Sequence, residues 1–350
     1  LATDFRSKVI GVALKDRAAI LPAGHSADAA YWWDTSAGHF VSSTFYMNDL
    51  PQWVKDFNKA NHTKPIFNIK TNDEGVTMTF KMAEAAVDNE RLGQTDGQTD
   101  MLTVSISSTD AIAHKYSTRG QENKSVFMRL DHDLAGFLNY LDEKVGKGNY
   151  LLFLTADHGA SHNYNFLKQH RIPADGWDYD KSVAELNKGL REKFPQLTAN
   201  PVLGEDNYHF YFNDKAYAPA DKQKVVDAAI ALLRKDKQFL WVVDNNKIME
   251  STVPEPIKSR LVNGIFPGRS GDITVVTRPQ VFGAEVSPTY RGTQHGQPMA
   301  YDVHIPFILY GWNVEHGEST KPLNITDIAP TICAMLHIQM PDAAIGTPAR

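Results

Sequence analysis

The chain of 350 residues has little cysteine, no long apolar run and no excess of positive charge. Its one cysteine, Cys333, rules out a disulfide within the chain, and its apolar neighbours predict a packed thiol rather than a nucleophile. No apolar run approaches the roughly 20 residues that span a bilayer, so we expect no membrane span. The formal net charge is -5 and the isoelectric point about 6.2, so we expect no nucleic-acid partner.

Apolar segments of strand length alternate with helical patterns along most of the chain. The segment Ser125–Val145, for example, has apolar residues at helical spacing and ends before Gly146. Such alternation predicts an α/β fold with three αβα layers, in which helices cover both faces of a mostly parallel central sheet. The expected strands are 9–14, 101–106, 150–155, 273–277 and 305–310. The aromatic residues of 31–46 could form a substrate platform, but core or interface packing is the better interpretation.

The alternation loosens between residues 160 and 246. This stretch combines two amphipathic helical patterns with two strand-like segments, which predicts an inserted α+β cap. We therefore expect three parts: a first core segment 1–159, the cap 160–246 and a second core segment 247–350.

Potential metal ligands lie close to three of the expected strands. Asp110 and His114 follow one strand, and residues four apart on a helical turn share a face, so both can reach one ion. Asp157 and His158 end another strand, where adjacent side chains diverge towards two neighbouring ions, or towards one ion approached across a turn. His295 lies in a glycine-containing loop. Carboxylate oxygens and imidazole nitrogens are ligands that zinc accepts.

Each of these motifs also has a simpler explanation. A single D-x-x-x-H occurs by chance in many proteins, and a histidine in a glycine-containing loop usually hydrogen-bonds to backbone. T-A-D-H-G at the end of an apolar strand is the more specific signal. Because all three motifs lie beside expected strands, a shared metal centre is the better interpretation of the set.

The order D-x-x-x-H, T-A-D-H-G and H-G resembles the alkaline phosphatase superfamily, which includes the type I phosphodiesterases and nucleotide pyrophosphatases. The segment Val9–Asp34 looks like the phosphate-contacting stretch of the phosphate-irrepressible alkaline phosphatases of Bacteroidetes. This resemblance implies zinc-dependent hydrolysis of phosphate monoesters, with two zinc ions and a phosphoenzyme intermediate. It also implies small phosphate esters and inorganic phosphate as ligands, and a periplasmic or secreted protein.

The resemblance also implies roles for individual residues. One zinc ion would be held by Asp110, His114 and His295, and half of the second site would come from Asp157 and His158. Lys15 and Arg17 would contact the phosphoryl oxygens, where cationic side chains stabilise the charge that spreads during transfer. Without the resemblance, K-D-R would predict only the start of a solvated helix.

The chain departs from the family at its start. Members of the family begin with a strand that ends in an aspartate ligand and with a helix that presents a Thr or Ser nucleophile. Thr3 and Asp4 are too close together to replace them. We therefore expect a truncated chain that fills one zinc site and half of the other, and that is inactive unless the missing segment is supplied. The alternatives are a phosphodiesterase or nucleotide pyrophosphatase of the same superfamily, and a non-catalytic metal-binding fragment.

Overall fold

The computed structural model describes residues 6–62 and 68–349, so Thr3 and Asp4 lie outside the described part. The chain divides into two compact units. Unit 1 contains the chain up to Ile112, together with Gly120–Asp157 and the segment from Pro306 onwards. Unit 2 contains Ala113–Arg119 and His158–Ile305. The predicted division at residues 159 and 246 stays a prediction, because compactness alone does not tell which segment is an insertion.

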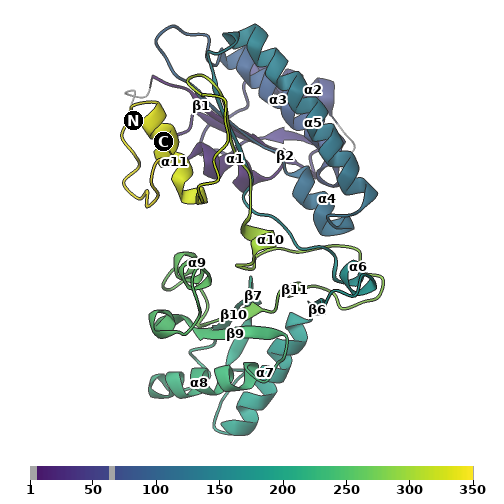
Figure 1. Ribbon diagram of the computed structural model, residues 1–350, viewed down its shortest axis with the longest axis vertical. Coiled ribbons are helices and arrows are strands. Elements are labelled where there is room, and N and C mark those ends of the chain that lie inside the picture. Colours follow the sequence, from purple (N-terminus) through teal and green to yellow (C-terminus); the bar gives the residue numbers. More distant parts are fainter. Residues whose placement is uncertain (1–5, 63–67, 350) are drawn as a thin grey trace. The chain divides into compact units, whose positions relative to one another are not determined.

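Unit 1 is built on a sheet with the strand order β3-β2-β1-β4. Strands β1 and β2 of this sheet are labelled in Figure 1. The central strand β1 (Val9–Ala13) is parallel to β2 (Ala29–Asp34) and to β4 (Met101–Ser105), and β3 (His39–Val41) is antiparallel to β2. A separate antiparallel pair joins β5 (Leu151–Thr155) to β12 (Phe307–Gly311). The helices of unit 1 are α1 (Asp16–Ala23), α2 (Gln52–Asn61), α3 (Glu74–Glu90), α5 (Gln121–Leu141) and α11 (Ile328–Met335).

Helices cover both faces of this sheet because successive side chains of β1 point in opposite directions. A Cβ at Gly11 would lie 2.1 Å from the carbonyl oxygen of Ala19, so α1 packs directly on that face of the strand. Leu14, the residue after β1, faces α3 instead. A Cβ at Gly75 in α3 would lie 2.8 Å from Cδ1 of Leu14. The result is the predicted layer order of helix, sheet and helix.

The aromatic segment that follows β1 is mostly core. Tyr31, Trp33 and Phe40 are buried, and the rings of Trp33 and Phe40 meet edge to face at 5.3 Å. Burial of side chains of this size stabilises a fold by roughly 1.5–3 kcal/mol each. Trp32 and Tyr46 are half-buried, and 60% of Phe45 is exposed. The prediction of core packing is thus confirmed for the three buried residues.

Unit 2 is built on an antiparallel sheet with the order β7-β8-β10-β9. Its strands are β7 (Val202–Asp206), β8 (His209–Phe212), β9 (Phe239–Asp244) and β10 (Ile273–Thr277). A small parallel pair is formed by β6 (Asp175–Trp177) and β11 (Val281–Gly283). Its helices are α6 (Tyr164–Gln169), α7 (Tyr179–Lys193), α8 (Lys222–Leu233), α9 (Ile257–Gly264) and α10 (Ala300–Val303).

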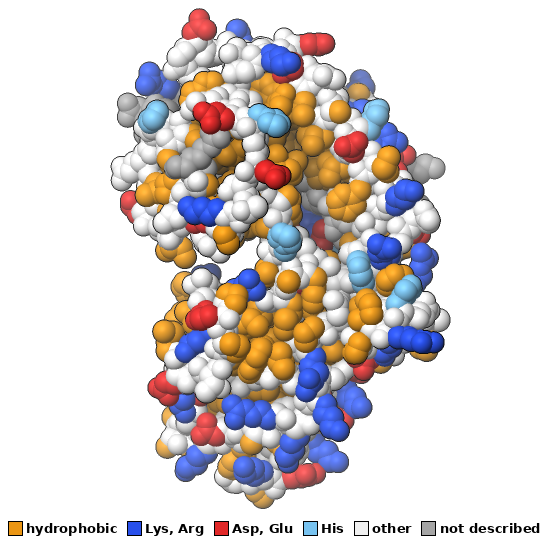
Figure 2. Space-filling model, viewed as in Figure 1, with side chains coloured by type: hydrophobic (Ala, Val, Ile, Leu, Met, Phe, Trp, Pro, Cys, Tyr) orange, Lys and Arg blue, Asp and Glu red, His pale blue; other side chains and the backbone are white. Residues whose placement is uncertain are grey.

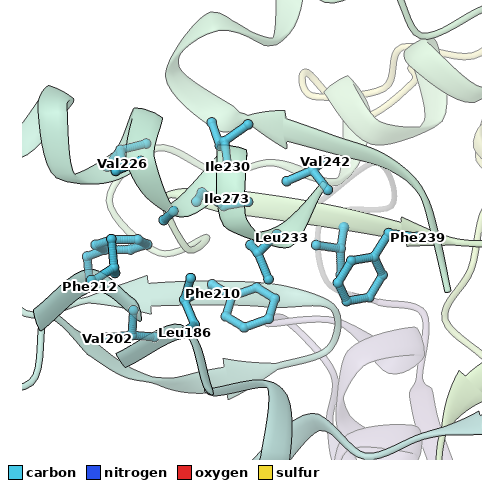
Figure 3. Packing of buried hydrophobic residues seen from close by; sticks show 14 of the residues in the cluster. Leu186, Val202, Phe210, Phe212, Val226, Ile230, Leu233, Phe239, Val242 and Ile273 are labelled. Atoms are coloured by element: carbon cyan, nitrogen blue, oxygen red, sulfur yellow. The ribbon is translucent and has the colours of Figure 1, made fainter. Parts of the chain in front are cut away.

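The core of unit 2 lies between this sheet and helices α7 and α8 (Figure 3). Helix α8 contributes Val226, Ile230 and Leu233, which are spaced so that they lie on one face of the helix. Strand β8 contributes Phe210 and Phe212, two residues apart and therefore on one face of the sheet. Both periodicities are visible in the sequence, and they explain why these segments pack as they do.

The surface mixes charges of both signs. On the face drawn in Figure 2, acidic side chains are interspersed among the lysine and arginine side chains of both units. Within the described ranges, no helix combines the length and the apolar character that crossing a membrane requires.

Candidate metal centre

The predicted ligands lie where the chain passes from one unit to the other. Helix α4 (Ser108–Tyr116) contains Asp110 in its first turn and His114 in its last turn, and the unit boundary falls between them. Asp157 is the last residue of its segment in unit 1, and His158 is the first residue of the next segment in unit 2. All three predicted histidine ligands therefore belong to unit 2.

Unit 2 brings these three histidines together. The rings of His158 and His295 are nearly parallel, with centroids 3.4 Å apart, and one possible ligand atom of each lies within 4.8 Å of the other. The ring of His114 has its centroid 5.0 Å from that of His295. Residues from distant parts of the sequence thus form one cluster, which we call the histidine cluster.

Backbone carbonyls fix the tautomer of two of these rings. Nδ1 of His114 lies 3.1 Å from the carbonyl oxygen of Thr293, and Nδ1 of His158 lies 2.9 Å from that of Gly159. A carbonyl oxygen only accepts hydrogen bonds, so Nδ1 of each ring must donate. In a neutral imidazole this leaves Nε2 with the lone pair, which is the state that binds a metal ion. The donor set therefore fits zinc.

Buried polar groups hold the loop that contains His295. Asn163 donates from Nδ2 to the carbonyls of Tyr290 and Gly292 at 3.0 and 2.8 Å, while its Oδ1 accepts from the backbone N–H of Phe166 at the start of α6. A Cβ at Gly292 would lie 2.1 Å from the carbonyl oxygen of His114, so the loop approaches the end of α4 closely. This approach explains why glycine occupies the position.

A buried carboxylate lies next to the histidine cluster. Asp302, on α10, is 3% exposed and accepts the backbone N–H of Gln297 at 2.7 Å. Burial raises the pKa of Asp302 to about 6, while the Gln297 hydrogen bond, the nearby His158 and a backbone hydrogen bond from Gly296 act in the opposite direction.

Unit 1 places a cation beside Asp110. Lys15, two residues after the end of β1, donates from Nζ to Oδ2 of Asp110 at 2.5 Å, and both side chains are partly buried. Arg17, in the first turn of α1, is 71% exposed. Burial lowers the pKa of Lys70, the charges of Lys15 and Arg17 act in the same direction, and Asp16 opposes them. The charges of Lys15 and Arg17 therefore act on Lys70. Contact of Lys15 and Arg17 with phosphoryl oxygens stays a prediction.

Sequence reasoning missed Asn163, Asp302 and Lys70. An asparagine directly before a helical segment is a local N-cap signal, so the position of Asn163 could have been noticed. Asp302 and Lys70 have no such signal, because their neighbours at the site are distant in the sequence.

Comparison with known proteins identifies the class to which this fold and this cluster belong. A family model described as type I phosphodiesterase / nucleotide pyrophosphatase matches residues 6–297. The chain therefore belongs to this family of hydrolases. The recognition made from the three motifs is confirmed.

Individual relatives refine this placement. Alkaline phosphatase PafA of Elizabethkingia meningoseptica is 39% identical, and the alignment covers 99% of this chain and 72% of that protein. Alkaline phosphatase PhoV of Synechococcus elongatus is 37% identical, and the alignment covers 99% of this chain and 70% of that protein. The crystal structure of wild-type PafA matches with a TM-score of 0.92 at 38% identity and covers 99% of this chain and 75% of that chain. The predicted α/β fold of the alkaline phosphatase type is thus confirmed.

Proposed function

We propose that the protein hydrolyses phosphate monoesters at a zinc centre. The observation that supports this most directly is the histidine cluster, in which backbone carbonyls accept hydrogen bonds from Nδ1 of two rings, so that Nε2 carries the lone pair of each neutral ring. The 39% identity to an alkaline phosphatase over 99% of the chain supports the same reaction. A phosphate ester and inorganic phosphate would be the ligands, and a periplasmic or secreted location is part of the proposal.

The proposed role of each residue follows from the chemistry of its side chain. Asp110, His114 and His295 would hold one zinc ion, and Asp157 and His158 would supply part of a second site. When bound, two such ions would neutralise charge on the attacking and leaving oxygens of an in-line displacement.

Two cations of unit 1 would act on the substrate. The Lys15 ammonium would serve as a compact charge, and the Arg17 guanidinium as a planar fork for two oxygens. A monoester presents more negative charge than a diester, so this pair favours the monoester.

A phosphodiesterase is the second candidate, because the matching family model is described by that activity. Turnover of a nitrophenyl monoester and of a methyl nitrophenyl diester by the same preparation of the complete protein would separate the two. We expect the monoester to be hydrolysed faster. Faster turnover of the diester would overturn the assignment, and bound zinc without turnover of either ester would favour a non-catalytic metal-binding role.

Metal dependence is tested with a matched pair of histidine variants. His295→Ala should lower the zinc content per chain and abolish recovery of activity when zinc is returned after chelation. His170→Ala is the control, because His170 is exposed and its Nδ1 lies 2.8 Å from the carbonyl oxygen of Phe166 in α6, outside the histidine cluster. Equal zinc content in both variants would contradict the proposed ligand set.

A further inference from the structure

Asp302 connects the two backbone segments that follow His158 and His295. Its carboxylate Oδ2 accepts the N–H of Gln297, two residues after His295. Its own carbonyl oxygen accepts the N–H of Gly159, the residue after His158, at 2.6 Å. One residue therefore joins both histidine-bearing loops through its side chain and its backbone.

The approach of α10 to the loop after His158 leaves little freedom. A Cβ at Gly159 would lie 2.2 Å from the carbonyl oxygen of Tyr301 and 3.5 Å from that of Asp302. Backbone therefore packs against backbone here, and a shift of α10 would move the segment next to His158.

One oxygen of the carboxylate lacks a hydrogen bond of ordinary geometry, although the backbone of Gly296 is close enough to act on the group. Oδ1 of Asp302 is buried and has no hydrogen-bond partner among the described residues. A buried carboxylate oxygen without a partner is costly, unless positive charge close to it compensates. The N–H of Gly159, the residue after His158, binds the carbonyl oxygen of Asp302, so the carboxylate lies close to the histidine cluster.

We propose that Asp302 is a positioning residue of the metal centre: it holds the loops of His158 and His295 in register and supplies a negative charge that favours a divalent cation between them. This inference rests on the proposed zinc centre. Groups that orient the ligands of a metal ion typically change its affinity by about 10–100-fold when they are replaced.

Two substitutions separate the charge from the hydrogen bond. Asp302→Asn keeps the shape and an oxygen for the Gln297 amide but removes the charge, so it should weaken zinc binding by about 10–100-fold. Asp302→Ala removes both, so zinc binding should weaken at least as much, and the Gln297 amide of the metal-free protein should exchange its hydrogen faster. Asp244→Asn is the matched control, because Asp244 is also buried in unit 2 and accepts a backbone N–H, from Asn246.

The affinity is measured by competition with a chromophoric zinc chelator, and amide exchange by mass spectrometry on the metal-free protein. We expect the Asp244 variant to match the wild type in both. If both Asp302 variants bound zinc with wild-type affinity, the positioning role would be refuted, but the proposed metal centre would not. A wild-type protein that binds no zinc would instead refute the proposed metal centre.

Discussion

Replacement of Asn163 should destabilise unit 2 through the loop that contains His295. The side chain is 5% exposed and makes three hydrogen bonds, two as donor to Tyr290 and Gly292 and one as acceptor from Phe166. Asn163→Ala removes all three, and each buried bond contributes about 1 kcal/mol. The Tyr290 carbonyl keeps one other donor, Asn165, so we expect a loss of about 2–3 kcal/mol.

Asn163→Asp tests which of these bonds matters. A carboxylate can still accept the N–H of Phe166 and cap α6, but it cannot donate to the two carbonyls and would repel them. We therefore expect the aspartate variant to be at least as destabilised as the alanine variant. If capping were the whole contribution of Asn163, the aspartate variant would match or exceed the stability of the wild type.

The assay is urea unfolding of the metal-free protein, from which the free energy of unfolding of each variant is obtained. Hydrogen exchange adds the location: amides of the loop before His295 should exchange faster in both variants, while those of unit 1 should not change. An aspartate variant with wild-type stability and unchanged exchange in this loop would refute the reasoning.

Three further substitutions test separate features. Gly292→Ala should lower the free energy of unfolding by about 1–3 kcal/mol, because the added Cβ would lie 2.1 Å from the carbonyl oxygen of His114. Gly264→Ala, where the added Cβ meets open space, should be neutral or mildly stabilising. Equal effects of the two substitutions would contradict the close approach at Gly292. Burial raises the pKa of Glu205 from 4.5 to about 7, so the folded chain keeps a proton that the unfolded chain has lost, and stability falls as the pH rises across this window. In Glu205→Gln, the drop in the free energy of unfolding between pH 5 and pH 8 should be smaller than in the wild type by about 1–2 kcal/mol. If the free energy of unfolding of both proteins changed equally with pH, this prediction would be refuted. Lys15→Ala should lower kcat/KM for a monoester by about 100-fold and for a diester by less, while Lys55→Ala, which changes an exposed ion pair, should leave both unchanged.

The sequence by itself determined the local elements and the family. The apolar run that ends at Asp157 predicted β5, and the helical spacing in 125–145 predicted a helix that the structure places at Gln121–Leu141. Near the end of the chain, α11 (Ile328–Met335) follows a short 3-10 turn that Asn324 and Asp327 cap. These predictions succeed because side-chain periodicity and capping depend on neighbours within a few residues.

Only the tertiary structure decided which distant groups meet. His114 and His295 are far apart in the sequence, and no local pattern states that their rings lie 5.0 Å apart. The same holds for the antiparallel pairing of β5 with β12, and for Asp302, whose backbone carbonyl oxygen accepts the N–H of Gly159 from another part of the chain. Such contacts depend on how the segments pack as a whole, because a side chain's ligands and hydrogen-bond partners are set by proximity in space and not by position in the sequence.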